Sequence, residues 1–377
     1  MRVLLVEPDY YARYPPLGLL KLATYHRLHG DTVWLVRGCR TDLPRPDIIH
    51  VTSLFTYAWR PVHAAVEFYK RQFPGVPVKL GGIYATLLPE HAALSGAEEV
   101  YRGLRNEVEG LIPSWDLVPE WDGSIIFASR GCIRKCGFCS VPKLEGPPDA
   151  LKDRISGLVY PGHSRVILWD NNILGNSNWE PIVDELSLLG LEVDFNQGLD
   201  ARLITNDMAE KLATLRTHSI RMAYDYPGIG PYVARAVERL DAAGIPRRKI
   251  VVYTLFNYVD SPEDFHRRIT ELATLGVTSY PMRFEPLTSL QKNAWLSPHW
   301  TREQLQMVAA ARRVMGFSGA FPPYRVLVDK FQKAEDFDEA FSMREVGCTK
   351  NRSKRAKTER YAGTLDWLSY VRRAHAS

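Results

Sequence analysis

Residues 129–146 read SRGCIRKCGFCSVPKLEG and hold Cys132, Cys136 and Cys139 in the spacing C-x3-C-x2-C. Each of the four irons in a [4Fe–4S] cluster normally takes one thiolate. Three cysteines this close together therefore leave one iron without a protein ligand. That iron is free to bind a small molecule directly, so the spacing predicts a cluster that takes part in a reaction.

Two other interpretations of the cysteines are weaker. A structural zinc site takes four ligands, usually as two pairs, and the remaining Cys39 and Cys348 are far from the loop and from each other in sequence. A disulfide needs an oxidising compartment. The chain starts MRVLLVEPDYY, whose apolar run is too short for a signal peptide. We therefore expect reduced thiols in a cytoplasmic protein.

The loop, with Phe138 just before the last cysteine, resembles the cluster loop of radical S-adenosylmethionine (SAM) enzymes. In that family the open iron chelates the amino and carboxylate groups of SAM. An electron passed to the sulfonium then breaks a C–S bond and gives a 5′-deoxyadenosyl radical. The resemblance implies a [4Fe–4S] cluster on the three cysteines, SAM as a cofactor, and an electron donor of the flavodoxin or ferredoxin type.

Composition is that of a globular protein with a sizeable core. The chain has 377 residues, of which 45% are hydrophobic, enough for two domains and a terminal extension. Strand-like and helix-like runs alternate along most of it, which predicts an α/β class. No apolar stretch approaches the roughly 20 residues of a membrane helix, so we expect no membrane partner. A net charge of +5 does not by itself indicate nucleic-acid binding.

Residues 1–112 predict a Rossmann-like domain, followed by a proline-containing linker at 113–122. Short apolar runs alternate with helical patterns, as in a parallel sheet. The strand candidates are Val3–Val6, Thr32–Val36, Ile48–Ser53 and Val76–Leu80. The helical patterns are 15–28, which opens with Pro15-Pro16-Leu17-Gly18, and 61–73.

The stretch PDYYARYPPLGLLKLATYHRLHGDTVWLV, residues 8–36, is similar to the start of cobalamin-binding radical SAM proteins. The cobalt-ligating motif D-x-H-x-x-G of that group is absent, and its nearest residues, Asp47 and His50, have the wrong spacing. The resemblance therefore leaves two alternatives open: cobalamin bound without the histidine, or a domain retained as a scaffold.

Six strand candidates recur across residues 123–298, with helical patterns between them. They are 124–129, 165–169, 191–195, 219–223, 249–255 and 279–284. This pattern matches the partial (β/α)6 TIM-like barrel of the radical SAM fold. Residues 299–377 predict a mainly helical C-terminal extension, with Thr301 and Gln304 as a capping box.

Polar residues follow the strand candidates, and parallel barrels bind ligands at the carboxyl ends of their strands. Asp170, Asn171 and Asn172 follow the second strand. By resemblance they occupy the place of a Gly-Gly-Glu run that binds the SAM amino group. The alternative is an Asx-rich turn that caps the strand, which these residues also favour.

Later strands offer further candidates for SAM binding. Gln197 suits a ribose hydroxyl or an adenine edge, and Tyr253 belongs to a fifth-strand segment that resembles the adenine-contacting one of the family. Asp200 and Arg202 either contact the cofactor or pair with each other and brace their loop. Arg221 would match the SAM carboxylate as a two-pronged donor, or it is a plain surface arginine. No catalytic residue of the substrate reaction is identified.

The combination of CIRKCGFCSVPKLEG, LWDNN and DFNQGLDARLIT resembles a little-characterised group of bacterial, archaeal and phage-borne radical SAM proteins. The leading hypothesis is a radical SAM enzyme that modifies an unactivated position of an unknown substrate. The run Lys350–Arg360 holds six basic residues and one acid. A basic run of this kind can follow the phosphate backbone of a nucleic acid, but a solvated tail is the commoner explanation. Nucleic acid and a peptide are the candidate macromolecular substrates. The other hypotheses are a cobalamin-dependent methyltransferase acting on a small molecule, and a non-catalytic, metal-stabilised binding module.

Overall fold

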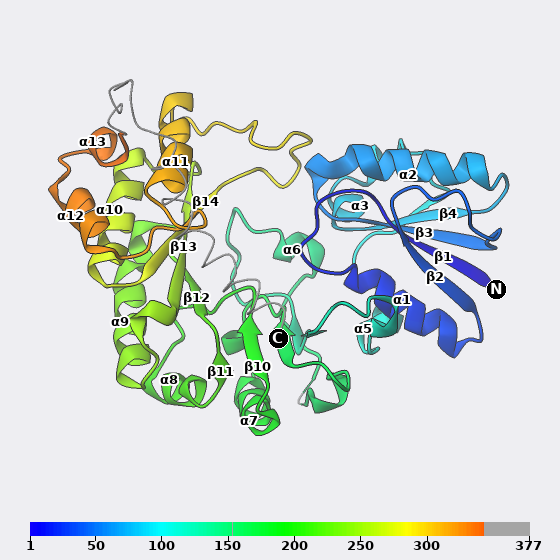
Figure 1. Ribbon diagram of the computed structural model, residues 1–377, viewed down its shortest axis with the longest axis horizontal. Helices are drawn as coiled ribbons and strands as arrows, with labels where there is room; N and C mark the ends of the chain where they lie inside the picture. The colour runs from blue at the N-terminus through cyan, green and yellow to red at the C-terminus, as the bar shows by residue number, and fades with distance from the viewer. Residues whose placement is uncertain (153, 343–377) are drawn as a thin grey trace, which may run out of the picture. The chain divides into compact units, whose positions relative to one another are not determined.

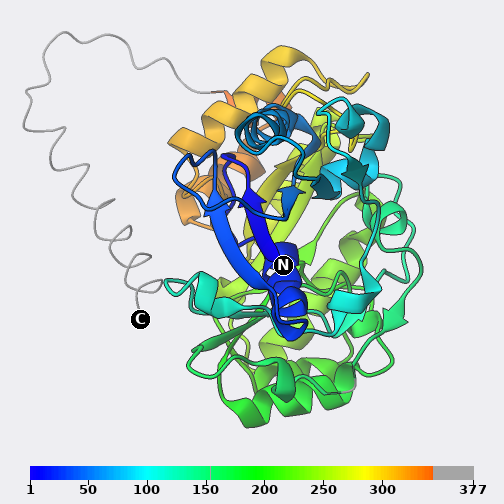
Figure 2. The same ribbon diagram turned by 90° about the vertical axis from the view of Figure 1, so that its right-hand side faces the viewer.

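The computed structural model describes residues 1–152 and 154–342. Residues Met1–Phe341 form one compact unit, shown in two views in Figures 1 and 2. The basic run Lys350–Arg360 and Cys348 lie outside the described residues. No helix among the described residues is long and apolar enough to cross a membrane.

The N-terminal part of the unit is built on a five-stranded parallel sheet with the order β2-β1-β3-β4-β5. Its strands are Arg2–Glu7 (β1), Thr32–Arg37 (β2), Ile48–Ser53 (β3), Val78–Gly82 (β4) and Glu99–Val100 (β5). Its helices are Leu17–Leu28 (α1), Trp59–Gln72 (α2), Ile83–Leu87 (α3), Pro89–Ala93 (α4) and Asn106–Glu109 (α5). The predicted parallel sheet is therefore confirmed.

Helices α1 and α2 cover opposite faces of this sheet (Figure 1). Alternate residues of β1 divide between them: Val3 and Leu5 pack with α1, whereas Leu4 and Val6 pack with α2. This is why β1 is an unbroken apolar run, since a strand covered on both faces has no side exposed to water.

The six strands predicted for the barrel are all present. They are Ser124–Ile126 (β6), Arg165–Leu168 (β9), Glu192–Phe195 (β10), Ile220–Ala223 (β12), Ile250–Phe256 (β13) and Thr278–Arg283 (β14). With the short Arg216–Thr217 (β11) they make two parallel sheets, β11-β10-β9-β6 and β12-β13-β14. Among the described residues, an isolated parallel bridge from Leu199 to Met222 connects the two. The short strands β7 (Ser129–Arg130) and β8 (Asp149–Ala150) form a separate antiparallel pair.

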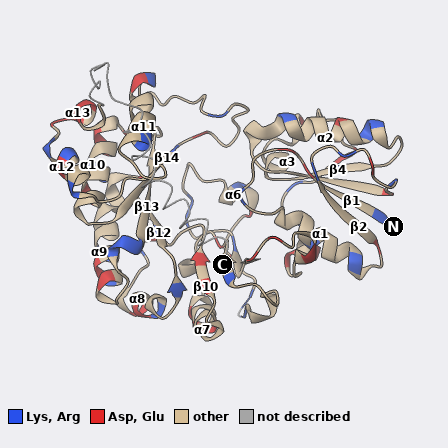
Figure 3. Ribbon diagram, in the orientation of Figure 1, with Lys and Arg blue, Asp and Glu red and all other residues tan. Residues whose placement is uncertain are grey.

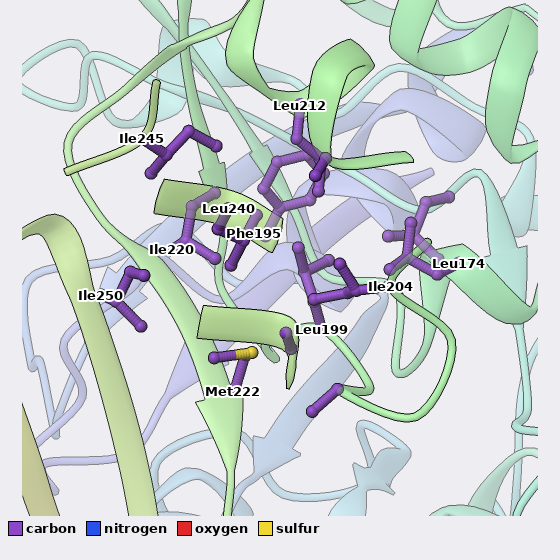
Figure 4. Close-up of a cluster of buried hydrophobic side chains, with 14 of the residues drawn as sticks. Leu174, Phe195, Leu199, Ile204, Leu212, Ile220, Met222, Leu240, Ile245 and Ile250 are labelled. Atoms are coloured by element: carbon purple, nitrogen blue, oxygen red, sulfur yellow. The ribbon is translucent and has the colours of Figure 1, made fainter. Parts of the chain in front are cut away.

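Helices cover one side of these strands. They are Trp179–Leu189 (α7), Asn206–Ala213 (α8), Gly230–Ala242 (α9) and Pro262–Thr274 (α10). Figure 4 shows Phe195, Ile220 and Met222 pointing into the core that the strands share with these helices. Because side chains alternate along a strand, Asp194 and Arg221 lie on the other, inner side.

The predicted helical extension begins with α11 (Arg302–Val314), and the capping box of Thr301 and Gln304 is present. Helices α12 (Arg325–Lys333) and α13 (Phe337–Phe341) follow, and both pack against α10. Figure 3 shows that most charged residues lie on helices and loops, whereas the strands carry few.

A fully buried arginine joins the ends of two barrel strands. Arg268 donates from Nη1 to the backbone oxygens of Tyr224 at 2.7 Å and Leu255 at 2.8 Å. Its Nη2 donates to Asp260 Oδ2 at 2.7 Å, and the Arg268 side chain is 0% exposed. The Arg268 guanidinium therefore balances the charge of the buried Asp260 carboxylate and provides hydrogen bonds for two backbone carbonyl groups.

The substitution Arg268→Met should lower the free energy of unfolding by about 3–5 kcal/mol, because it leaves Asp260 buried without its partner. Urea unfolding measures this change. The neighbouring Arg267→Met removes an exposed arginine paired with Asp264 and should change the same quantity by less than about 0.5 kcal/mol. Equal effects of the two substitutions on the free energy of unfolding would contradict the role of Arg268 as the buried partner of Asp260.

His50 lies inside β3, is 6% exposed, and its Nε2 has no hydrogen-bond partner among the described residues. Burial, reinforced by the nearby His26, lowers the pKa of His50 to about 3 from 6.5. Below pH 6.5 the unfolded chain therefore binds a proton at this position that the folded protein does not. The free energy of unfolding falls as the pH falls through this range.

Between pH 7 and pH 5 the contribution of His50 should lower the free energy of unfolding by about 2 kcal/mol. The variant His50→Leu should lose this part of the pH dependence, measured by urea unfolding at the two pH values. His218→Leu, at an exposed histidine, should keep the dependence of the wild type. If the free energy of unfolding of His50→Leu depends on pH as in the wild type, the lowered pKa of His50 is not the cause of this dependence.

Candidate cluster and cofactor site

The cysteine loop lies between β7 and helix α6 (Val141–Leu144). Its two ends come together because β7 pairs with β8 just beyond the loop, with Arg130 opposite Asp149. Gly131 makes the entry to the loop and has φ +71°. A Cβ at this position would lie 2.2 Å from the backbone oxygen of Pro147. Only glycine therefore allows the two arms of the loop to approach this closely.

The three cysteines are free and partly buried. Burial raises the pKa of the Cys136 and Cys139 thiols, and the neighbouring thiolates raise it further. The three thiols are thus within electrostatic reach of one another, and a bound cation would stabilise them as thiolates. As placed, no three His, Cys, Asp or Glu side chains of the described residues form a set of metal ligands. Holding a cluster therefore requires the thiols to turn toward one another, and their soft donor chemistry fits iron and sulfur.

An ion-pair network connects the tip of the cysteine loop, at Arg134, to the segment that follows the third barrel strand, β10. Arg134, between the first two cysteines, donates from Nε to Asp200 Oδ2 at 2.9 Å. Arg202 donates to both oxygens of the same carboxylate, at 2.7 and 3.0 Å. Burial opposes the charge of Asp200, but the bonds from Arg202 and Arg134 outweigh it and lower its pKa. Asp200 and Arg202 pair as the bracing alternative predicted, and they do so beside the cysteine loop.

The three residues after β9 have different surroundings. Asp170, 3% exposed, accepts from Ala128 N at 3.1 Å, Ser129 N at 2.5 Å and Ser129 Oγ at 2.6 Å. These bonds hold the chain that leads into the cysteine loop. Asn171 donates to Glu145 Oε2 at 2.8 Å, on the far arm of that loop.

Asn172 is the member of this group with an unsatisfied atom. Its Nδ2 lies 3.5 Å from Asp200 Oδ2, and its buried Oδ1 has no hydrogen-bond partner among the described residues. Asn176, four residues on, likewise has a buried and unpartnered Nδ2. Both side chains are 7% exposed. Buried polar atoms normally find a partner, so two unpaired atoms this close point to a ligand or ordered water.

These two asparagines line a cavity of about 220 Å³ that also reaches the first cysteine. The cavity is lined by Ser129, Arg130, Gly131, Cys132, Ile133, Pro148, Asp149, Ala150, Asn172, Gly175, Asn176 and Ser177. Two of the predicted site residues, Cys132 and Asn172, therefore line the same cavity. Asn176 was not predicted, since an asparagine in a polar turn gives no signal in the sequence.

Gln197, Arg221 and Tyr253 are not among the residues that line this cavity. Gln197 donates to Asn196 Oδ1 at 3.3 Å, and Asn196 in turn donates to the Tyr14 hydroxyl. Arg221 pairs with Asp194, its side chain is 15% exposed, and it is therefore not a surface arginine. The Tyr253 ring packs edge-on against Tyr280, with centroids 5.6 Å apart. The proposed contacts of Gln197, Arg221 and Tyr253 with SAM stay predictions.

The aromatic residue before the last cysteine packs against the loop after β13. The rings of Phe138 and Tyr258 meet edge-on with centroids 5.8 Å apart, and Tyr258 also packs against Phe284. A Cβ added at Gly137 would lie 2.8 Å from the Tyr258 hydroxyl. Tyr258 thus holds the second half of the cysteine loop near the fifth strand. It was not among the residues predicted for the site.

Asp225, at the end of β12, is a further acidic group near this site. Burial raises its pKa to about 6, although Arg268 and Arg202 oppose the shift. Its charge also acts on the Cys136 and Cys139 thiols. Asp225 was not among the predicted site residues, since no local pattern in the sequence indicates that it lies near the cysteines.

No protein-family model matches the chain. Two curated relatives are ribosomal protein uS12 methylthiotransferases RimO. The protein of Chlorobium limicola is 26% identical over 168 residues, which are 43% of this chain and 33% of the relative. That of Chlorobaculum tepidum is 26% identical over 164 residues, 43% of this chain and 32% of the relative. The chain spans about a third of the length of the curated relatives it matches.

Among solved structures, the fold is similar to that of TsrM from Kitasatospora setae, a radical SAM methyltransferase. The TsrM structure with cobalamin and a [4Fe–4S] cluster aligns with a TM-score of 0.59 at 14% identity, over 76% of this chain and 77% of that chain. The structure with a tryptophan substrate and a SAM analogue aligns with a TM-score of 0.58 at 14% identity, over 83% and 77%. These alignments confirm the expected α/β fold.

Proposed function

We propose that this chain is a radical SAM enzyme that binds a [4Fe–4S] cluster through Cys132, Cys136 and Cys139 and modifies an unactivated position of its substrate. The observation that carries the proposal is the three-thiol loop beside a cavity with two unsatisfied asparagine side chains. When bound, the cluster supplies the electron that cleaves SAM, and SAM supplies the radical. The protein's part is to hold both and to position the substrate.

The cavity beside Cys132 suits the amino-acid end of SAM. Asn172 offers an amide oxygen, which accepts from an ammonium group, and Asn176 offers an amide nitrogen, which donates to a carboxylate. Asp170 and Asn171, by contrast, form their hydrogen bonds with residues in the stem of the cysteine loop. We therefore assign SAM contact to Asn172 and a supporting role to its two neighbours.

The inner side of the barrel strands offers polar groups to a substrate. The Asp194–Arg221 ion pair lies there. Burial raises the pKa of the Tyr14 and Tyr253 hydroxyls, and the charges of Asp194 and Arg221 also act on both. Among the relatives, TsrM is described with a tryptophan substrate and RimO is named for a ribosomal protein. Both favour a small molecule or a protein over nucleic acid as the substrate of this chain.

Methyl transfer with cobalamin is the second candidate function, favoured by the likeness to TsrM and by the edge of the N-terminal sheet. Tyr11, Phe55 and Ile83 follow β1, β3 and β4 and are 84%, 42% and 38% exposed. Open α/β sheets bind ligands outside the carboxyl ends of their strands, so this apolar edge suits a large planar cofactor. His50 is buried within β3 and cannot reach the edge, so cobalamin would bind here without that histidine.

The protein reconstituted anaerobically with iron and sulfide, and supplied with SAM and a reductant, should produce 5′-deoxyadenosine. The variant Cys136→Ala should produce none, because it removes one of three cluster ligands, whereas Cys39→Ala, at an exposed cysteine outside the loop, should match the wild type. Chromatography of the products and the cluster absorbance measure both effects.

The same reaction separates the two candidate functions. S-adenosylhomocysteine together with corrinoid absorbance in the purified protein would support methyl transfer, whereas corrinoid-free protein that makes only 5′-deoxyadenosine would refute it. Normal SAM cleavage by Cys136→Ala would refute the assignment of the cluster ligands.

Removing the unsatisfied amide should weaken SAM binding. The substitution Asn172→Ala is expected to raise the dissociation constant of SAM about tenfold, the equivalent of one hydrogen bond to a charged group. Calorimetry on the cluster-loaded protein measures it. Asn206→Ala, at an exposed asparagine on α8, is the control and should leave the constant unchanged. An unchanged constant for Asn172→Ala would contradict the proposed contact.

A further inference from the structure

A chain of buried charges connects the N-terminal domain, residues 1–112, to the cysteine loop. Lys21 of α1 donates to the backbone oxygen of Glu109 at 2.8 Å, and its Nζ lies 3.5 Å from Glu109 Oε2. The same Oε2 accepts from Arg130 twice, from Nε at 2.9 Å and from Nη2 at 2.6 Å. Arg130 is only two residues before Cys132, so Glu109 reaches the base of the loop.

The chain of charges continues to the other arm of the loop. Arg130 Nη1 donates to Glu145 Oε1 at 3.1 Å. The second oxygen of Glu145 accepts from Gly131 N at 2.9 Å and from Asn171 Nδ2 at 2.8 Å. Glu145 therefore closes the stem of the loop, since it binds the residue at its start from the segment after its end.

All four charged side chains of this arrangement are largely buried. The side chains of Lys21, Glu109, Arg130 and Glu145 are between 7% and 15% exposed. Two cations alternate with two carboxylates, so every charge is compensated by a neighbour. The Arg130 guanidinium also lies 3.3 Å from the centre of the Phe127 ring, which stabilises it further. Loss of one member leaves its neighbours buried without compensation, which is strongly unfavourable.

We infer that Glu109 is a positioning residue for the cluster: it holds Arg130 in place, and Arg130 with Glu145 holds the stem of the cysteine loop. The inference rests on the proposed function, since it concerns the same three thiolates. It also gives the N-terminal domain a role in the cluster site that does not depend on whether cobalamin binds there. The stem is held from the N-terminal domain, while Arg134 and Asp200 hold the tip from the barrel.

The test compares two substitutions on the same short helix of the full-length protein. Glu109→Gln removes the buried carboxylate, whereas Glu107→Gln removes an exposed one, 42% accessible, that pairs with Arg105. Both variants lose one negative charge. After anaerobic reconstitution, two quantities are measured: the rate of iron loss to a chelator, and the reduction potential of the cluster followed by electron paramagnetic resonance.

Glu109→Gln should lose iron about tenfold faster than the wild type, as is usual when the partners that orient metal ligands are removed. Its reduction potential should become more positive, because one negative charge near the cluster is gone and added electrons meet less repulsion. Glu107→Gln should match the wild type in both quantities, since water and salt screen its charge.

Other outcomes are decisive. A wild-type protein that takes up no cluster would refute the proposed function itself. A cluster that forms normally and behaves alike in the wild type and in both variants would overturn only the role of Glu109. If Glu109→Gln does not fold, Glu109→Asp keeps the charge but shortens the arm that holds Arg130, so iron loss should still be faster. Iron loss at the wild-type rate from Glu109→Asp would then overturn the inference.

Discussion

The buried guanidinium of Arg130 is the contact on which the geometry of the site depends. It sits between the carboxylates of Glu109 and Glu145 and thereby joins three segments that are well separated in the chain. A charge with this little access to water is stable only when its partners are in place. The position of the cysteine loop is therefore coupled to the packing of α1 and α5 and to the end of β9.

The two sheets of the barrel follow from a simple division of the strand residues. One side of strands β6, β9, β10, β12 and β13 packs against helices α7–α10 through apolar side chains, whereas the other side carries Asp194, Arg221 and Tyr253. The inner surface keeps these polar groups because neighbouring residues of a strand point to opposite sides.

The elements of the fold were predictable because their signals are local. The apolar run of β1, the alternating pattern of the barrel strands and the capping box at Thr301 each depend on residues a few positions apart, and all three are present in the structure. The cysteine spacing is local in the same way. The pairing of Asp200 with Arg202 could also be predicted as one of two alternatives, since the two residues are close in sequence.

Local patterns were enough to predict the α/β architecture and the kind of cofactor that three clustered thiols suit. Contacts between distant segments determine which of the neighbouring polar side chains keep an unpaired atom. Asp170, Asn171 and Asn172 are equivalent candidates in the sequence, yet two of them are hydrogen-bonded to the cysteine-loop stem and one keeps an unpaired oxygen. The physical reason is that a buried polar group is satisfied by partners tens of residues away, such as Ser129 and Glu145, which no local pattern identifies.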